Sequence, residues 1–208
     1  MRVALKIMVV GLSVAFARAA AAQPIHIVAF GDSLTSGYLV PRDQAYPAQL
    51  QAVLRKNSYD VIVKNAGLAG GTAEHALRRF DAAIDPGTDI AIVEFGINDR
   101  RAGASLAQVR GRIAELLRTL RLRHVETLVV GAGGLDFSGV AKANGALYAE
   151  WKLPPHKYRA RDGAHFNAAG YAILVERMLP KIEMLIRRAG QPPPNAGGRP
   201  RNAGNRRA

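Results

Sequence analysis

A serine follows the first apolar run of the folded part of the chain, in a position that suits a nucleophile. The run Ile25 to Phe30 stops at Gly31-Asp32-Ser33, which predicts a buried strand with Ser33 at its carboxyl end. Open α/β sheets bind ligands in the crevice outside the carboxyl ends of their strands. Gly, Asp and Ser are also common turn residues, so this segment alone leaves an ordinary turn as an open alternative.

Three later segments carry groups that complement this serine. A glycine-rich turn over residues 65–72 enters a helix, so its backbone N–H groups are able to face negative charge. Asn98 adds a side-chain amide, and the spacing from Asp162 to His165 lets the carboxylate fold back onto an imidazole nitrogen. Each segment alone is also an ordinary turn or cap. Together they offer a nucleophile, a base, an orienting acid and oxyanion donors.

The elements that must position these groups alternate along the chain between short apolar runs and amphipathic segments. This alternation predicts a parallel sheet with helices on both sides. The predicted strands cover residues 25–30, 61–63, 90–95, 127–130 and 146–151. The predicted helices cover residues 47–56, 72–84, 105–120 and 138–143, and a last one from Asn167 that Pro180 should kink or interrupt. Ser105 and Gln108 have capping-box spacing, and Asn167 is a good N-cap.

The two ends of the chain differ in composition from residues 23–190, which are long enough for one domain. Residues 1–22 combine a basic start, an apolar stretch and alanines before Gln23, which predicts a cleavable signal peptide. Residues 191–208 are rich in Pro, Gly, Asn and Arg, which predicts a disordered basic tail. These features predict a periplasmic or secreted protein. An uncleaved anchor is the alternative for the N-terminal segment.

The formal net charge is +13, and the two ends hold seven of these positive charges, so residues 23–190 carry +6. Solubility explains that charge at least as well as an anionic partner does. We expect no specific nucleic-acid partner and only weak contact of the tail with anionic surfaces. The chain has no cysteine, which excludes a thiolate nucleophile, disulfides and thiolate metal sites. The histidines show no paired ligands in the sequence, so no metal site is expected.

Four blocks of the chain, GDSLTSGY, NAGLAGGT, GIND and DGAHFN, resemble the motif blocks of the GDSL esterases and lipases, also called SGNH hydrolases. The resemblance covers most of residues 25–185 and is nearest to the small bacterial thioesterase and lysophospholipase-like esterases. It implies a flavodoxin-like α/β fold, a three-layer α/β/α sandwich with a mostly parallel five-stranded sheet. Position by position, it implies a catalytic triad of Ser33, Asp162 and His165. It also implies an oxyanion hole of the Ser33 and Gly70 backbone N–H groups and the Asn98 amide.

The activity implied by the resemblance is cleavage of an ester or thioester through an acyl-enzyme, with no cofactor and a small-molecule substrate. The chain departs from the family pattern at Gly71 and Phe166, and neither change removes a catalytic atom. Only a short segment separates Gly131 from Asp162, which predicts a shallow pocket for short acyl groups. The alternatives are an O-acetylesterase acting on carbohydrate and a non-catalytic module that binds envelope polysaccharide.

Other polar and aromatic residues near these blocks have two interpretations each. Arg100 and Arg101 follow the asparagine block, and a solvated loop is the favoured reading over contact with an anionic substrate. Trp151 is read as packing at a strand end, with contact to the acyl group as the alternative.

Overall fold

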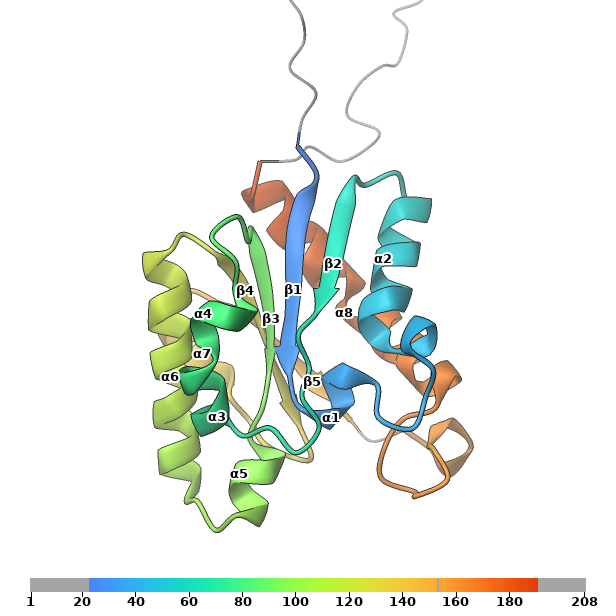
Figure 1. Ribbon diagram of the computed structural model, residues 1–208, viewed down its shortest axis with the longest axis vertical. Coiled ribbons are helices and arrows are strands. Elements are labelled where there is room, and N and C mark those ends of the chain that lie inside the picture. The colour runs from blue at the N-terminus through green and yellow to red at the C-terminus, as the bar shows by residue number, and fades with distance from the viewer. Residues whose placement is uncertain (1–22, 153, 191–208) are drawn as a thin grey trace, which may run out of the picture.

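The computed structural model describes residues 23–152 and 154–190, and the predicted signal peptide and basic tail lie outside these residues. Within them, five parallel strands form one sheet in the order β2-β1-β3-β4-β5, with helices on both faces (Figure 1). This confirms the predicted three-layer α/β/α fold and makes the sheet parallel throughout. The strands are β1 (Ile25–Gly31), β2 (Val61–Asn65), β3 (Ile90–Glu94), β4 (Glu126–Ala132) and β5 (Leu147–Trp151).

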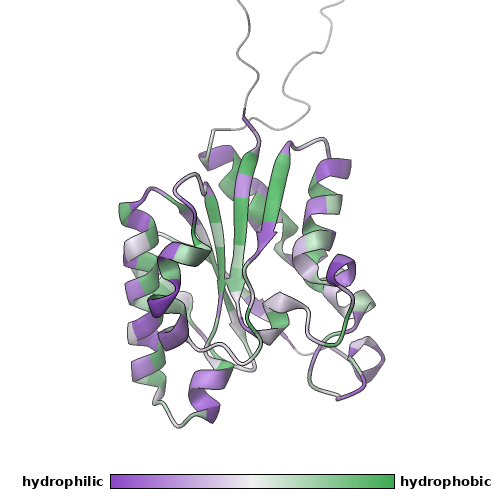
Figure 2. Cartoon of the chain, viewed as in Figure 1, coloured by the Kyte–Doolittle hydropathy of each residue, from purple (hydrophilic) through white to green (hydrophobic). Residues whose placement is uncertain are grey.

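The helices divide into two groups that cover opposite faces of the sheet (Figure 1). One face packs against α2 (Tyr46–Lys56) and α8 (Ala168–Arg188). The other packs against α3 (Ala73–Arg78), α4 (Phe80–Ala83), α6 (Leu106–Leu122) and α7 (Ser138–Ala143). Successive side chains of β1 enter different cores, Ile27 one and Val28 the other, which explains why this strand is apolar throughout. Figure 2 shows the hydrophobic sides of the helices turned toward the sheet.

Two short helices and two 3₁₀ turns complete the described chain, and all lie in connections. The helices are α1 (Ser33–Ser36) and α5 (Ile97–Arg101), and the turns are η1 (Arg42–Gln44) and η2 (His156–Tyr158). The predicted caps are confirmed. Ser105 and Gln108 form a reciprocal capping box at the start of α6, and Gly170 N–H donates to Asn167 Oδ1 over 2.9 Å at the start of α8.

The helix predicted over residues 72–84 is divided into α3 and α4 at Arg79. The Arg79 side chain turns inward, where its guanidinium donates to the carbonyls of Ala66 and Gly31 and lies 4.5 Å from the centre of the Phe30 ring. The helical backbone is interrupted at this residue, whose φ is −106° and ψ 14°, and the side chain ties α3 to the ends of β1 and β2. An arginine is normally a surface residue, so helical periodicity does not reveal the break.

The predicted interruption of the last helix at Pro180 does not occur, because α8 runs through it from Ala168 to Arg188. Proline removes the N–H that would bond the carbonyl of Glu176, and both residues lie on the exposed face, where water can satisfy that carbonyl. On the buried face, Met178 and Ile182 pack into the core on either side of the proline. Tertiary packing therefore holds the helix together.

The strand order places the first predicted segment at the centre of the sheet edge. The chain leaves β1 for β2 on one side and later returns to β3 on the other, which makes the carboxyl end of β1 a topological switch point. The segments that follow β2 and β3, and the loop before α8, reach the same edge at the bottom of Figure 1. Four segments far apart in the sequence thus meet there.

Candidate active site

Ser33 is the first residue of α1, directly after β1, and its side chain is half-buried. The preceding Asp32 caps this short helix, since its Oδ1 accepts the N–H of Leu34 over 2.9 Å. Gly31 is required here because a Cβ would lie 2.0 Å from Oγ1 of Thr35 and 2.8 Å from the carbonyl oxygen of Glu94. The tight turn presents the serine hydroxyl at the edge of the sheet.

The three residues of the predicted triad lie in contact. His165 Nε2 is 2.9 Å from Ser33 Oγ, and His165 Nδ1 is 2.5 Å from Asp162 Oδ2. Asp162 and His165 belong to a loop that is closed by a bridge between Arg159 and Phe166 and by the N–H of Ala160, which donates to His165 O over 2.8 Å. This loop brings the imidazole to the serine from 132 residues away in the chain.

Asp162 is held as an ionised hydrogen-bond acceptor. Its Oδ1 accepts the backbone N–H groups of Ala164 and His165, each over 3.0 Å. The His165 backbone bond, followed by the contact with the imidazole, lowers the pKa of Asp162 to about 2. The carboxylate is therefore charged at any pH near neutrality and able to stabilise an imidazolium.

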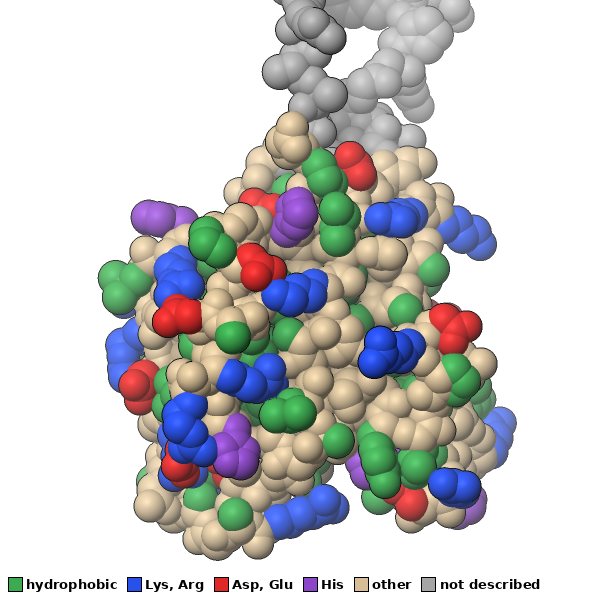
Figure 3. Space-filling view, in the orientation of Figure 1, with side chains coloured by type: hydrophobic (Ala, Val, Ile, Leu, Met, Phe, Trp, Pro, Cys, Tyr) green, Lys and Arg blue, Asp and Glu red, His purple; other side chains and the backbone are tan. Residues whose placement is uncertain are grey.

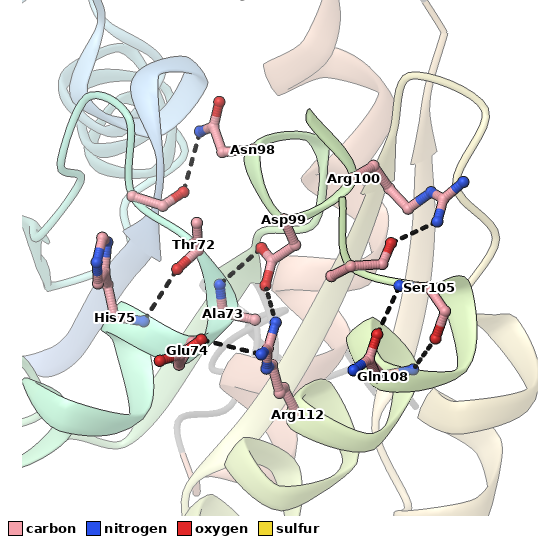
Figure 4. A network of polar contacts seen from close by, with 12 residues as sticks. Thr72, Ala73, Glu74, His75, Asn98, Asp99, Arg100, Ser105, Gln108 and Arg112 are labelled. Carbon is pink, nitrogen blue, oxygen red and sulfur yellow. Dashed lines mark hydrogen bonds and ion pairs between the residues drawn. The ribbon is translucent and has the colours of Figure 1, made fainter. Parts of the chain in front are cut away.

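The predicted oxyanion donors occupy the same edge. The Ser33 and Gly70 backbone N–H groups make no hydrogen bond within the described chain, and Gly70 is exposed with φ of +76°. Asn98 Nδ2 donates to Asp32 Oδ2 over 3.1 Å and to the Gly71 carbonyl over 3.0 Å, the second contact being drawn in Figure 4. For Asn98 to donate to an oxyanion, one of these two contacts must lengthen. The three groups can then supply up to three donors to one oxygen.

A pocket of about 550 Å³ opens beside Ser33 and His165. It extends from β1 toward the ends of β4 and β5, and most of its walls are apolar. The apolar side chains of the lining are Leu34, Ile97, Ala132, Leu135, Trp151, Ala164 and Phe166. Figure 3 shows the hollow at the bottom of the molecule, between the side that carries α5 and the loop before α8.

Two sequence interpretations change at this pocket. Arg100 and Arg101 are exposed to solvent, as the favoured interpretation expected, but they belong to the short helix α5 instead of a loop, and they line the pocket. Trp151 both packs at the end of β5, where it is 2% exposed, and forms part of the pocket wall.

Within residues 23–152 and 154–190 there is no cluster of three or more His, Cys, Asp or Glu side chains that could hold a metal ion. No helix of this described part is long and apolar enough to span a bilayer.

A model of the GDSL-like Lipase/Acylhydrolase family matches residues 29–152. The chain belongs to this family. The matched segment begins within β1 and ends just after β5, so it includes the serine, glycine and asparagine blocks, and the histidine block follows it. The predicted family and the expectation of a GDSL-type hydrolase acting on ester bonds are confirmed at this level.

Three curated GDSL-like relatives show how far the similarity extends. Esterase TesA of Pseudomonas aeruginosa is 26% identical over 185 residues, which cover 80% of this chain and 91% of TesA. Thioesterase 1/protease 1/lysophospholipase L1 of Escherichia coli is 30% identical over 114 residues, 54% of this chain and 52% of that protein. An arylesterase of Vibrio mimicus is 27% identical over 46% of this chain and 48% of its own length. The last two matches thus span about half of each relative.

A solved structure supports the fold. The crystal structure of a protein named TesA has a TM-score of 0.69 and 24% identity, with 77% of this chain and 99% of that chain covered. This degree of similarity shows a shared SGNH-hydrolase-like architecture.

Beneath the GDSL serine lies a buried pair of carboxyl groups that sequence reasoning missed. Glu94 ends β3 with none of its surface exposed, and its Oε2 accepts the Asp32 N–H over 3.3 Å and Thr35 Oγ1 over 3.0 Å. Burial, followed by the nearby Asp32 charge, raises the pKa of Glu94 well above its ordinary value. Burial also raises the pKa of Asp32, but less than that of Glu94, because Asp32 accepts the Leu34 N–H and the Asn98 amide; Asp32 is therefore the member that ionises first. A carboxylic acid at the end of an otherwise apolar strand was the signal in the sequence.

Replacing Glu94 by glutamine should flatten the dependence of stability on pH. The ordinary pKa of a glutamate is near 4.5. Because the pKa of Glu94 is raised in the folded chain, the folded chain keeps this proton at pH values above 4.5, where the unfolded chain has lost it. Wild-type stability should therefore fall as the pH rises from that value toward the folded-state pKa of Glu94. Glutamine mimics the neutral acid and removes this contribution. Urea unfolding at several pH values measures the difference, and equal pH slopes in both proteins would show that Glu94 ionises normally.

The position of Asn98 depends on its neighbour Asp99, whose carboxylate is buried. Asp99 accepts the Ala73 N–H over 2.8 Å and pairs with Arg112 at 3.1 Å, while Arg112 also pairs with Glu74 (Figure 4). These contacts tie α5 to α3 and α6. The short helix that carries the Asn98 amide is therefore held in place by the buried side chain of Asp99.

Asn98→Ala is expected to lower kcat by about 10²- to 10³-fold, the usual effect of removing one oxyanion donor. KM should change little, because the amide acts on charge that develops in the transition state. Steady-state kinetics with one ester substrate measures both constants. A variant that raises KM while keeping kcat would place Asn98 in substrate binding instead.

Proposed function

We propose that this chain is a serine hydrolase that cleaves carboxylic ester or thioester bonds through an acyl-enzyme, with short acyl groups as preferred substrates. The observation that carries this proposal is the continuous chain of contacts Ser33–His165–Asp162, at 2.9 and 2.5 Å, beside an apolar pocket. A binding module would have no physical need for this arrangement.

In the proposed reaction, Ser33 Oγ attacks the substrate carbonyl carbon while His165 Nε2 takes the hydroxyl proton. Asp162 stabilises the imidazolium, and the developing oxyanion accepts the Ser33 and Gly70 N–H groups and the Asn98 amide. His165 then returns the proton to the departing alcohol or thiol. A water molecule, activated by the same imidazole, hydrolyses the acyl-enzyme and regenerates the serine.

The preference for short acyl groups rests on the walls of the pocket. Trp151 and Phe166 are both 2% exposed and pack against each other, with ring centres 6.4 Å apart. Both rings form part of the pocket wall. The short connection between β4 and β5 adds Gly133 and Leu135 to the lining and contains only the six-residue helix α7. The volume of about 550 Å³ also lies within the ordinary range for a small ligand.

Hydrolysis of p-nitrophenyl esters from acetate to decanoate, together with matched thioesters, tests the proposal. We expect kcat/KM to be highest among the shorter chains and to fall as the acyl group lengthens. A maximum at the longest chains would contradict the short-chain preference. No turnover of any ester by the folded protein would contradict the activity. Release of acetate from acetylated oligosaccharides alone would favour the carbohydrate O-acetylesterase.

We also propose that the protein acts outside the cytoplasm, because residues 1–22 have the composition of a signal peptide. Expression of the full chain followed by N-terminal sequencing tests this. The expected product is an exported protein that begins near Gln23, whereas an intact N-terminus on a cytoplasmic product would contradict it.

A further inference from the structure

We propose that Arg100 and Arg101 recognise an anionic group on the substrate, and that the preferred acyl group carries a carboxylate at its far end. This inference rests on the proposed hydrolase function and names its substrate class. The two arginines line the same pocket as Ser33 and His165. They would act as specificity-determining residues and take no part in the bond-breaking steps.

The orientation of α5 is what directs these side chains into the pocket. Asp99 points to the opposite side, where it is buried against Ala73 N–H and Arg112. On a helix, residues three and four apart share a face, so Ile97, Arg100 and Arg101 lie together. Ile97 also lines the pocket, and its Cδ1 lies 3.2 Å from where a Cβ on Gly133 would be. The buried Asp99 therefore sets the side of the helix that faces the substrate.

The charges of the two guanidinium groups are not neutralised by acidic partners. Arg101 is exposed and makes no hydrogen bond or ion pair within the described chain, and Arg100 donates only to the Ala104 carbonyl. By contrast, the arginines that pair with carboxylates are Arg78, Arg112, Arg123 and Arg188. The Ala104 contact restrains Arg100 and leaves it with further N–H donors. Two positive charges are thus available at one wall.

Among the described residues, no exposed acidic side chain lines the pocket to oppose these charges. Asp32 is the only carboxylate of this described lining, and it is 1% exposed and engaged by Leu34 and Asn98. Figure 3 shows a basic side chain reaching into the mouth of the hollow from the side that carries α5. An apolar pocket with cationic groups at one end suits a ligand with an aliphatic chain and a terminal anion.

The pocket is assigned to the acyl chain by its direction from Ser33. It extends toward β4 and β5, whereas Gly70 follows β2 on the other side of β1 and does not line it. With the carbonyl oxygen directed at the Gly70 N–H, we place the acyl chain in the pocket and the leaving group outside it. Arginine binds carboxylates through paired N–H donors, so a carboxylate that reaches α5 would be held in a defined position.

The test compares the p-nitrophenyl monoester of adipic acid with p-nitrophenyl hexanoate, which has the same number of acyl carbons and no carboxylate. We expect Arg100→Gln/Arg101→Gln to lower the adipate-to-hexanoate ratio of kcat/KM by about 10-fold or more. Added salt should lower the wild-type ratio. Arg101→Gln alone should lower it in part, and this variant also serves if the double variant does not fold. Arg118→Gln on the exposed face of α6 removes one charge far from the pocket and should leave the ratio unchanged.

Three results would overturn the inference. The ratio could be the same in the wild type and the arginine variants, or Arg118→Gln could lower it as much as Arg101→Gln does. The arginine variants could also discriminate only against a carboxylate on the leaving group. This is measured by comparing phenyl acetates that carry a para-carboxylate with those that carry a para-carboxamide. If the wild type hydrolyses no ester, the proposed function fails separately. Calorimetric binding of adipate and hexanoate to the same variants then still decides the role of the arginines.

Discussion

Ser33→Ala is expected to lower kcat for ester hydrolysis by about 10⁴- to 10⁶-fold while the protein remains folded. The hydroxyl oxygen lies 2.9 Å from His165 Nε2 and is the only hydrogen-bond partner of that nitrogen within the described chain. Without it, the oxyanion donors and the pocket can still bind substrate, but no acyl-enzyme forms. Because Ser33 is only half-buried and its side chain is small, the thermal midpoint should stay close to that of the wild type.

Ser36→Ala provides a matched control in the same short helix. Ser36 Oγ donates to the Ser33 carbonyl over 3.2 Å, and its side chain lies outside the pocket lined by His165. Its removal should change kcat by a small factor only. Single-turnover kinetics of both variants, with circular dichroism to verify folding, separates loss of the nucleophile from damage to α1. If Ser33→Ala kept kcat within about tenfold of the wild type, another nucleophile would be at work.

Asp162→Asn is expected to lower kcat by about 10⁴-fold, because it forces the wrong imidazole tautomer. Oδ1 of Asp162 accepts two backbone N–H groups, so an asparagine must keep its oxygen there and place its NH₂ group against His165 Nδ1. Nδ1 must then accept a hydrogen bond, which leaves the proton on Nε2. That nitrogen can no longer receive the proton of Ser33.

The same argument predicts that Asp162→Ala differs from Asp162→Asn in stability. Alanine loses both backbone contacts of Oδ1 and should destabilise the loop before α8, whereas asparagine retains them. Thermal midpoints and kcat for the two variants give the comparison. If Asp162→Asn had nearly full activity, another group would have to orient His165. If both variants unfolded at the same temperature, the two backbone contacts would contribute little.

The parts of the fold and site that were predictable from sequence depend on short stretches of the chain. Strand β1 is apolar because both of its faces are covered, and this left a continuous apolar run that stops just before Gly31-Asp32-Ser33. Side chains that follow parallel strands reach one edge, so the groups at Gly70 and Asn98 could be placed there without coordinates. The capping residues Ser105 and Asn167 were visible because capping depends on residues only three apart.

The features that the sequence did not reveal depend on contacts between distant segments. The Asp32 and Glu94 pair forms across 62 residues, and Arg79 turns inward only because the ends of β1 and β2 offer carbonyls. Pro180 is tolerated because two buried neighbours anchor α8. Arg100 and Arg101 read as loop residues, and their approach to the pocket follows from the ion pair of Asp99 with a helix that begins later in the chain.

The placement of Trp151 has a spectroscopic consequence. It is the only tryptophan of the 208 residues, and it forms a wall of the pocket 5.0 Å from the Tyr46 ring and 6.4 Å from the Phe166 ring. The intrinsic indole fluorescence of the whole protein therefore originates at this one place. A ligand that fills the pocket replaces water beside this indole and should change its emission. Colourless esters and their acid products can thus be ranked by titration of the unlabelled protein.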